Sequence, residues 1–305
     1  MVIRFEKENL WDNVPEVRNY YEAYIALLAK NILSLEELEQ IDAIVIPDDF
    51  VAGVTAYQQK NKIAEAPVTN NEHARAYGKM LFSPLTQKYS VYIDFWIAEM
   101  LIDDNVFSAC NKSLDETELD CLKNRRARAH NLFAHELVHI SFDIRMKLLR
   151  NVKPINSGLD RFIYILFDEY NACRVAASYF PLNGLGFDKE YISALEEEIN
   201  NYKPEKRNNR QFLPLFLQNT QMALVHLASC LGSNETGKVT QLPLGGTVVG
   251  KHASTLRNIF DNCFCQLQDS NIFVLPKEAV NVVKSYYADL GVNVKESIKG
   301  LYFSY

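Results

Sequence analysis

The pentapeptide His135-Glu136-Leu137-Val138-His139 constrains this chain more than any other stretch. In an α-helix, residues four positions apart project from one face, so the two histidines can offer two imidazole nitrogens to a single metal ion. Zinc prefers imidazole nitrogen and carboxylate oxygen in a tetrahedral arrangement, and a catalytic zinc site leaves one position for water. Glu136 would then take the proton of that water. The pentapeptide therefore predicts a helix that carries part of a metal site.

The residues around the pentapeptide repeat apolar side chains at helical spacing. This stripe consists of Leu132, Phe133, Leu137, Ile140 and Ile144. It predicts an amphipathic helix. The alternative interpretation is a helix whose two histidines only pack against or cap their neighbours, because the pentapeptide also arises by chance. A candidate for a third ligand favours the metal site.

That candidate lies about thirty residues later, on a second apolar helix that carries Asp168 and Glu169 and ends before Pro181. The buried stripe of this helix is formed by Ile165, Leu166, Ala172, Val175, Ala176 and Tyr179. The stripe places Glu169 beside the inward face, so Glu169 is the predicted third ligand. Asp168 is the alternative ligand; otherwise it is a solvated acid or a group that orients an imidazole ring. Asp143, one turn after His139, could also orient a ring or face water.

The two segments together resemble the ImmA/IrrE family of bacterial zinc metallopeptidases. The matching residues are the A-H-E-L-x-H run from Ala134 to His139, followed by Glu169, Ala172, Ala176, Ala177 and Pro181. Two places depart from the family pattern. The family usually has Gly where this chain has Val138, and it has an R-F-T-like segment where this chain has His130 to Phe133. The longer motif H-E-x-x-H-x-x-G-x-x-H of the metzincins is excluded, because Phe142 and Arg145 occupy its last two positions.

The resemblance implies a zincin-like fold and a particular division of roles among these residues. His135, His139 and Glu169 would bind one Zn²⁺ per chain, and Glu136 would be the general base. Members of the family are intracellular regulators that often cleave helix-turn-helix repressors. The resemblance therefore implies a cytoplasmic endopeptidase of narrow specificity whose substrate is a regulatory partner protein, by analogy.

Composition and charge narrow the possible partners. The 305 residues are 48% hydrophobic, enough for one large domain or two modest ones. The first residues are charged, and the sequence lacks an apolar run long enough for a membrane helix, so we expect a cytosolic protein. The six cysteines are scattered, so we expect buried thiols and no disulfide framework. A net charge of -6 argues against nucleic-acid binding, although Lys123 to Arg128 is a basic run. That run is a solvated helix face or, as the alternative, a DNA contact.

We predict an α+β fold in two regions. Residues 1–185 would form a zincin-like domain in which a small antiparallel sheet lies beside the active-site helix, and 186–305 a mostly helical region. In the first region, Ser34 and Asp48 or Asp49 are predicted helix caps. Expected strands cover 43–46, 79–82 and 90–102, and expected helices cover 14–33, 188–202, 211–231, 254–267 and 277–290.

The strands 79–82 and 90–102 are expected to form a hairpin directly before the active-site helix. In zincins the strand edge beside that helix binds the substrate as an added strand, because an extended peptide satisfies its backbone groups on an exposed edge. By resemblance, the substrate groove should lie along this hairpin. The alternative is an ordinary strand with a covered edge.

Three classes of function remain open at this point. The first is zinc-dependent peptide hydrolysis, in which the oxyanion donor is Tyr170, Tyr164, His130 or His252. The second is a catalytically inactive zinc protein that serves as a regulatory or interaction partner. The third is a helical interaction module in which the pentapeptide is incidental. Retention of Glu136, which is no zinc ligand, favours the first class over the second.

Overall fold

The structure is a computed structural model that describes residues 1–6, 14–63, 76–149, 158–182, 189–202, 213–233, 244, 246–297 and 300–304. The chain divides into two compact units. Unit 1 comprises Met1–Ile144 and Val175–Asn183, and unit 2 comprises Arg145–Arg174 and Gly184–Tyr305. The predicted boundary near residue 185 lies where the chain leaves unit 1 for the second time. The segment Arg145–Arg174, which the sequence placed with the N-terminal region, belongs to unit 2.

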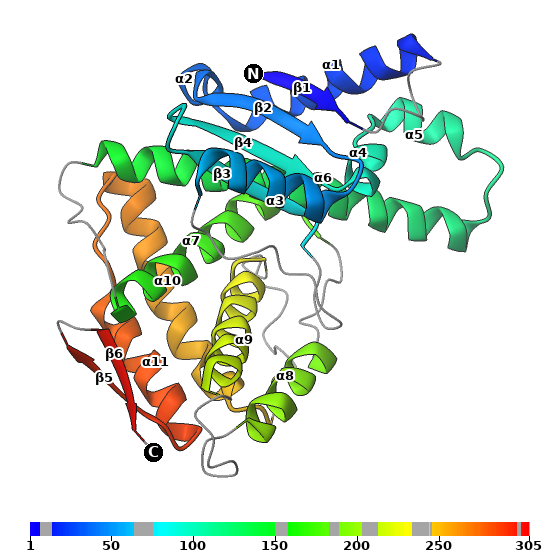
Figure 1. Ribbon diagram of the computed structural model, residues 1–305. Coiled ribbons are helices and arrows are strands. Elements are labelled where there is room, and N and C mark those ends of the chain that lie inside the picture. Colours follow the sequence, from blue (N-terminus) through cyan, green and yellow to red (C-terminus); the bar gives the residue numbers. More distant parts are fainter. Residues whose placement is uncertain are drawn as a thin grey trace. The chain divides into compact units, whose positions relative to one another are not determined.

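Unit 1 is built on a four-stranded sheet with the order β1-β2-β4-β3 (Figure 1). β1 (Val2–Phe5), β2 (Ile41–Ile46) and β4 (Lys88–Ile93) are parallel, and β3 (Gly78–Ser83) pairs with β4 as an antiparallel hairpin. The fold is α+β as predicted, but the prediction of an antiparallel sheet is wrong outside the hairpin. Helices connect β1 to β2 and follow β2, and such crossovers return the chain in the parallel direction.

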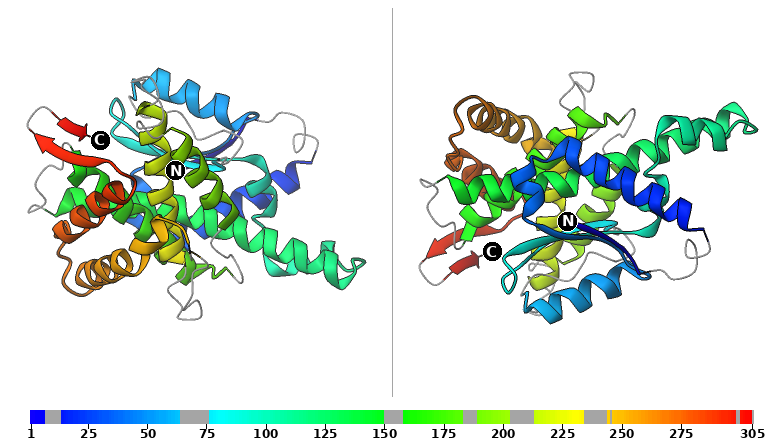
Figure 2. Two further views of the ribbon diagram at one scale, coloured as in Figure 1. Left: turned by 90° about the horizontal axis from the view of Figure 1, so that it is seen from below. Right: turned by 90° about the horizontal axis from the view of Figure 1, so that it is seen from above.

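Helices cover both faces of this sheet. α1 (Pro15–Ile32) and α6 (Glu116–Leu148) pack on one face, and α3 (Phe50–Asn61) packs on the other (Figure 2). Each face of the sheet has its own hydrophobic core, and successive side chains of β2 point into one core and then the other. Ile44 lies in the core with α1 and α6, whereas Val45 lies in the core with α3. α6 is therefore held along its apolar stripe against the sheet.

Two predicted helix caps in unit 1 are confirmed. At the start of α2 (Leu35–Glu39), Ser34 Oγ accepts a hydrogen bond from the Glu37 backbone N–H at 3.3 Å, and Glu37 accepts one from the Ser34 N–H at 2.7 Å. At the start of α3, the Asp49 carboxylate accepts from the Ala52 N–H at 2.8 Å. Both caps satisfy backbone donors that a helix start leaves without a partner.

The prediction of a strand over 90–102 is wrong beyond Ile93. There Asp94 caps α4 (Phe95–Met100) by accepting a hydrogen bond from the Trp96 N–H at 3.3 Å, and α5 (Asp104–Cys110) follows. The residues from 95 to 98 are all apolar, so they fit the period of a strand and that of a helix equally well. The carboxylate cap favours the helix.

Unit 2 is mainly helical. Its helices include most of α7 (Gly158–Tyr179), α8 (Lys189–Asn201), α9 (Leu213–Ser233), α10 (Ala253–Ser270) and α11 (Lys277–Asp289). The four helices predicted after Pro181 are thus confirmed within a few residues. The C-terminal tail adds an antiparallel pair, β5 (Asn293–Ser297) and β6 (Gly300–Ser304), that was not predicted. Across the part of the chain that the structure describes, no helix is both long and apolar enough to cross a membrane.

Candidate metal centre

His135 and His139 approach each other on α6 in unit 1. Their Nε2 atoms are 2.9 Å apart, and their rings lie edge to face with centroids 4.5 Å apart. Two nitrogen ligands of a tetrahedral zinc ion, each about 2.0 Å from the metal, would lie about 3.3 Å apart. In the structure the two imidazoles are joined by a hydrogen bond between these nitrogens, and a shared ion would need them a few tenths of an ångström farther apart.

The rest of α6 keeps this pair of histidines in place. Phe133 and Leu137 are fully buried in the core beneath the sheet. The Asp143 carboxylate accepts a hydrogen bond from the Tyr89 hydroxyl of β4 at 2.6 Å. Asp143, one of the acids considered for orienting an imidazole, thus links α6 to the sheet.

Glu136 lies against the edge strand of the sheet. Its side chain is buried, and its Oε2 accepts a hydrogen bond from the Met80 backbone N–H of β3 at 2.7 Å. A Cβ atom on Gly78 would come within 2.7 Å of Glu136 Cγ, so only glycine leaves room for this side chain. The residue expected to act as a base is therefore fixed at the edge of β3.

The edge of β3 that faces away from β4 lies beside Glu136. Among the described residues, β3 pairs only with β4, and the Met80 N–H donates to Glu136. Alternate residues of a strand direct their N–H groups to the same side, so the Gly78 N–H points to this edge as well. Glu136 thus lies at an edge of the sheet that none of the described strands covers.

Glu169 is on α7 in unit 2 and is half-buried. Its Oε1 accepts a hydrogen bond from the Ser229 hydroxyl of α9 at 2.8 Å, and the Cys173 Sγ lies 3.9 Å from the same oxygen. Cys173 is buried one helical turn after Glu169, and burial raises the pKa of its thiol well above the usual value. The prediction of buried thiols is right for Cys173 and Cys263 but wrong for Cys110, Cys121 and Cys265, which are exposed. Cys173 lies four residues after Glu169, a spacing that places both on one face of the helix. Asp168, the alternative ligand, is half-buried and directly precedes Glu169 on the helix.

Each of the four candidates for an oxyanion donor contacts other residues of the protein. Tyr170 in unit 2 is buried, donates to Asp261 and accepts from Arg174 at 2.5 Å. Burial raises the pKa of its hydroxyl. Also in unit 2, His252 is 3.2 Å from Asp289, and the Tyr164 ring packs edge to face on Phe273.

The fourth candidate, His130, is buried in unit 1. Its Nδ1 is 2.9 Å from the Arg126 carbonyl oxygen, and its Nε2 is 3.2 Å from the Tyr24 hydroxyl. It lies five residues before His135, so it projects from a different face of α6. Burial lowers the pKa of His130 to about 4. The folded state therefore favours the neutral imidazole of His130.

We expect the His130→Gln variant to lose part of the acid sensitivity of the wild type. Because the folded pKa of His130 lies below the usual 6.5, the unfolded state binds more protons between pH 6.5 and about 4. Stability should therefore fall as the pH falls through this range, by up to about 3 kcal/mol from this group. Urea unfolding at pH 7, 6, 5 and 4.5 measures the difference between wild type and variant. Equal slopes for both proteins would contradict the assignment.

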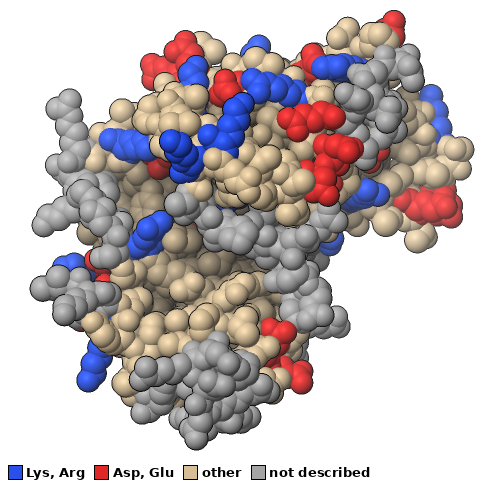
Figure 3. Space-filling view, viewed as in Figure 1, with Lys and Arg blue, Asp and Glu red and all other residues tan. Residues whose placement is uncertain are grey.

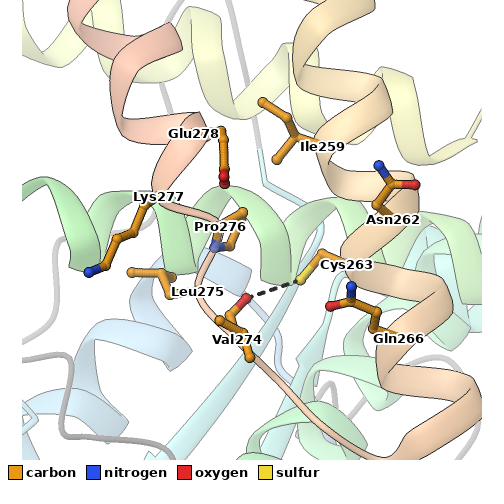
Figure 4. Close-up of a pocket in the computed structure, with 9 residues that line it drawn as sticks. All are labelled: Ile259, Asn262, Cys263, Gln266, Val274, Leu275, Pro276, Lys277 and Glu278. Carbon is orange, nitrogen blue, oxygen red and sulfur yellow. Dashed lines mark hydrogen bonds between the residues drawn. The ribbon is translucent and has the colours of Figure 1, made fainter.

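A separate cavity of about 540 Å³ in unit 2 lies between α10 and the segment that leads into α11 (Figure 4). Its lining includes the amides of Asn262 and Gln266, and the Cys263 thiol donates to the Val274 carbonyl oxygen at 3.6 Å. Its described lining contains no histidine, and Cys263 and Glu278 are its only cysteine and carboxylate. This lining therefore differs from the two-histidine donor set of the candidate metal centre.

Comparison with known proteins finds no matching family model, no similar curated protein and no similar solved structure.

Proposed function

We propose that this chain is a zinc-dependent endopeptidase of narrow specificity. His135, His139 and Glu169 would hold one Zn²⁺, and Glu136 would be the general base. The observation that carries the proposal is the convergence of the two histidine Nε2 atoms, 2.9 Å apart, on a helix whose intervening glutamate is fixed at a strand edge. Glu136 ties α6 to β3 through this bond, and as a residue that is no zinc ligand it also fits a catalytic site better than a structural one.

The continuity of α7 supports the participation of Glu169, which belongs to unit 2. α7 is one helix from Gly158 to Tyr179, and its end lies in unit 1, where the Phe180 carbonyl accepts a hydrogen bond from Asn131 at 2.9 Å. Asn131 precedes His135 by one turn. Glu169 is therefore on a helix whose residues belong to both units.

The donor chemistry also fits a metal. His135, Glu169 and Cys173 carry an imidazole, a carboxylate and a thiol, and zinc accepts all three donor types. Ser229 binds the Glu169 carboxylate from the side of α9, as expected for a group that orients a ligand.

The roles of the chain's own residues follow from this arrangement. Bound zinc would supply a Lewis acid that polarises the scissile carbonyl and acidifies a water molecule. The Glu136 carboxylate would accept the proton of that water and deliver it to the leaving amine. The edge of β3 that faces away from β4 would hold the substrate as an added strand, with its backbone beside Glu136. By the family analogy, that substrate is a cytoplasmic regulatory protein such as a helix-turn-helix repressor.

A second candidate is a zinc-binding regulatory protein without catalytic activity. The proximity of Cys173 to Glu169 favours it, because a fourth protein ligand would close the coordination sphere to water. A Cys173→Ala variant separates the two functions: hydrolysis that is unchanged leaves the thiol outside the sphere, whereas hydrolysis that first appears in the variant identifies a closed site.

Metal content tests the proposal directly. We expect about one zinc per chain in the purified protein and almost none in His139→Ala, because a site with two remaining ligands binds weakly. Glu169→Ala should also lose zinc, whereas Asp168→Ala, its matched neighbour, should keep it. Elemental analysis after dialysis gives the ratios. A wild-type protein free of metal after careful handling would reject the peptidase, and loss in Asp168→Ala alone would move the third ligand to that residue.

A further inference from the structure

The basic run Lys123 to Arg128 divides into two groups with different surroundings. Lys123 pairs with Asp120 at 3.0 Å, and Arg126 pairs with Asp104 at 2.7 Å and also donates to the Ile102 carbonyl. Within the described part of the chain, Arg125 and Arg128 form no ion pair. The charges of these two arginines are therefore available to a ligand.

Arg125 and Arg128 line a cavity of about 570 Å³ in unit 1, whose other described lining residues are Tyr77, Trp96, Cys121 and Asn124. The Tyr77 and Trp96 rings meet edge to face with centroids 5.3 Å apart, and the Arg125 guanidinium lies 5.5 Å from the Trp96 centroid. This described lining contains two cationic side chains, two aromatic rings and no acid. It suits an anionic group on an apolar stem.

The position of the cavity on α6 relates it to the candidate metal centre. One stripe of the helix runs through Cys121, Arg125, Arg128, Leu132, His135 and His139 at steps of four and three residues. Arg128 precedes His135 by seven residues, which is about 10 Å along the axis, and an extended peptide covers that length with about three residues. Tyr77 directly precedes Gly78, the first residue of the edge strand β3. A peptide along this edge would therefore reach the cavity.

We propose that this cavity binds an acidic side chain, Glu or Asp, of the peptide substrate, about three residues from the bond that is cut. The inference rests on the proposed function for the position of that bond. Guanidinium groups bind carboxylates by paired, charge-assisted hydrogen bonds, and the two rings would pack on the aliphatic stem of the acid.

The observations favour an acidic peptide over a nucleic acid. Two unpaired arginines are few for a phosphate backbone, since Lys123 and Arg126 of the same run are engaged by acids. The chain carries a net charge of -6. Figure 3 shows both basic and acidic side chains among the described residues of the face that it draws. A nucleic-acid-binding surface is instead expected to carry a cluster of basic side chains.

Trp96 reports on the cavity, because Trp11 is the only other tryptophan of the sequence. The experiment uses the full chain with Trp11→Phe and Glu136→Gln, so that emission comes from Trp96 and the peptide is not cut. The probes are a blocked peptide Ac-Ala-Glu-Glu-Glu-Ala-NH₂, its Gln counterpart, and a dT₁₂ oligonucleotide. We expect the Glu peptide to change the emission saturably and to bind at least tenfold more tightly than the Gln peptide. The double variant Arg125→Gln and Arg128→Gln should lose that preference, and Lys123→Gln, the matched control, should keep it.

The other outcomes separate the two proposals. No response to the Glu peptide, or a response that survives the double arginine change, overturns the acidic site. A response to dT₁₂ alone that depends on the arginines overturns it in favour of nucleic acid. Cleavage of a peptide library by the wild type without enrichment of acids near the cut also overturns it and leaves the peptidase intact. Arginine-dependent binding of the Glu peptide by a chain without zinc upholds the site while the proposed peptidase fails.

Discussion

Replacement of Glu136 by Gln should lower peptide hydrolysis by about 10²- to 10⁴-fold and leave the zinc content unchanged. Glu136 is not one of the proposed ligands, so the ion should stay. The amide oxygen of Gln can still accept the hydrogen bond from the Met80 N–H, so the position beside β3 should persist. What the variant loses is a carboxylate that can take up and release a proton. Hydrolysis of a peptide library, zinc analysis and thermal unfolding of the same preparations measure the three properties.

Asp143→Asn is the matched control for this experiment. Asp143 lies on the same helix, and its carboxylate binds the Tyr89 hydroxyl of the sheet, which an amide can also do. We expect its rate to stay within a few-fold of the wild type. Turnover of Glu136→Gln at the wild-type rate would reject Glu136 as the base, and loss of zinc in that variant would show that Glu136 binds the ion.

The helices were predictable where one local signal was strong. The stripe through Leu137 and Ile140 defines one face of α6 whatever surrounds the helix, and the S-x-x-E box at Ser34 satisfies its own backbone groups. Both are properties of residues within a few positions of each other. The approach of His135 to His139 was predictable for the same reason, because a single helix turn brings the two imidazoles together.

The parts that depend on distant residues were not predictable in the same way. The direction of β2 against β4 is set by pairing across long connections, and α4 replaced a strand because Asp94 caps it. In the candidate centre, the bond between Glu136 and Met80 joins residues 56 positions apart, and the one between Ser229 and Glu169 joins residues 60 apart. Periodicity reports none of these contacts. The cavity beside Arg125 needs rings from two other segments, so the basic run alone could not reveal it.

The Arg174→Ala variant should lower the free energy of unfolding of unit 2 by about 3 kcal/mol. Arg174 is buried between α7 and α10, where its Nη1 is 2.5 Å from both the Asp261 carboxylate and the Tyr170 hydroxyl. Its guanidinium also stacks 3.9 Å above the Phe264 ring. Removal leaves a carboxylate whose main counter-ion is gone. The expected loss is at the lower end of the range for buried pairs, because the Asp261 side chain is 32% exposed.

Arg257→Ala is the control, since Arg257 approaches the same carboxylate at 3.6 Å but is more exposed. It should cost about 1 kcal/mol or less. Urea unfolding of the metal-free proteins gives both values. If α7 positions Glu169 as proposed, Arg174→Ala should also weaken zinc binding at urea concentrations where the variant is still folded, because Arg174 lies five residues after that ligand. Equal losses in the two variants would show that Asp261 is stabilised mainly by solvent. Unchanged zinc affinity in a clearly destabilised Arg174→Ala would separate the packing of α7 on α10 from the metal centre.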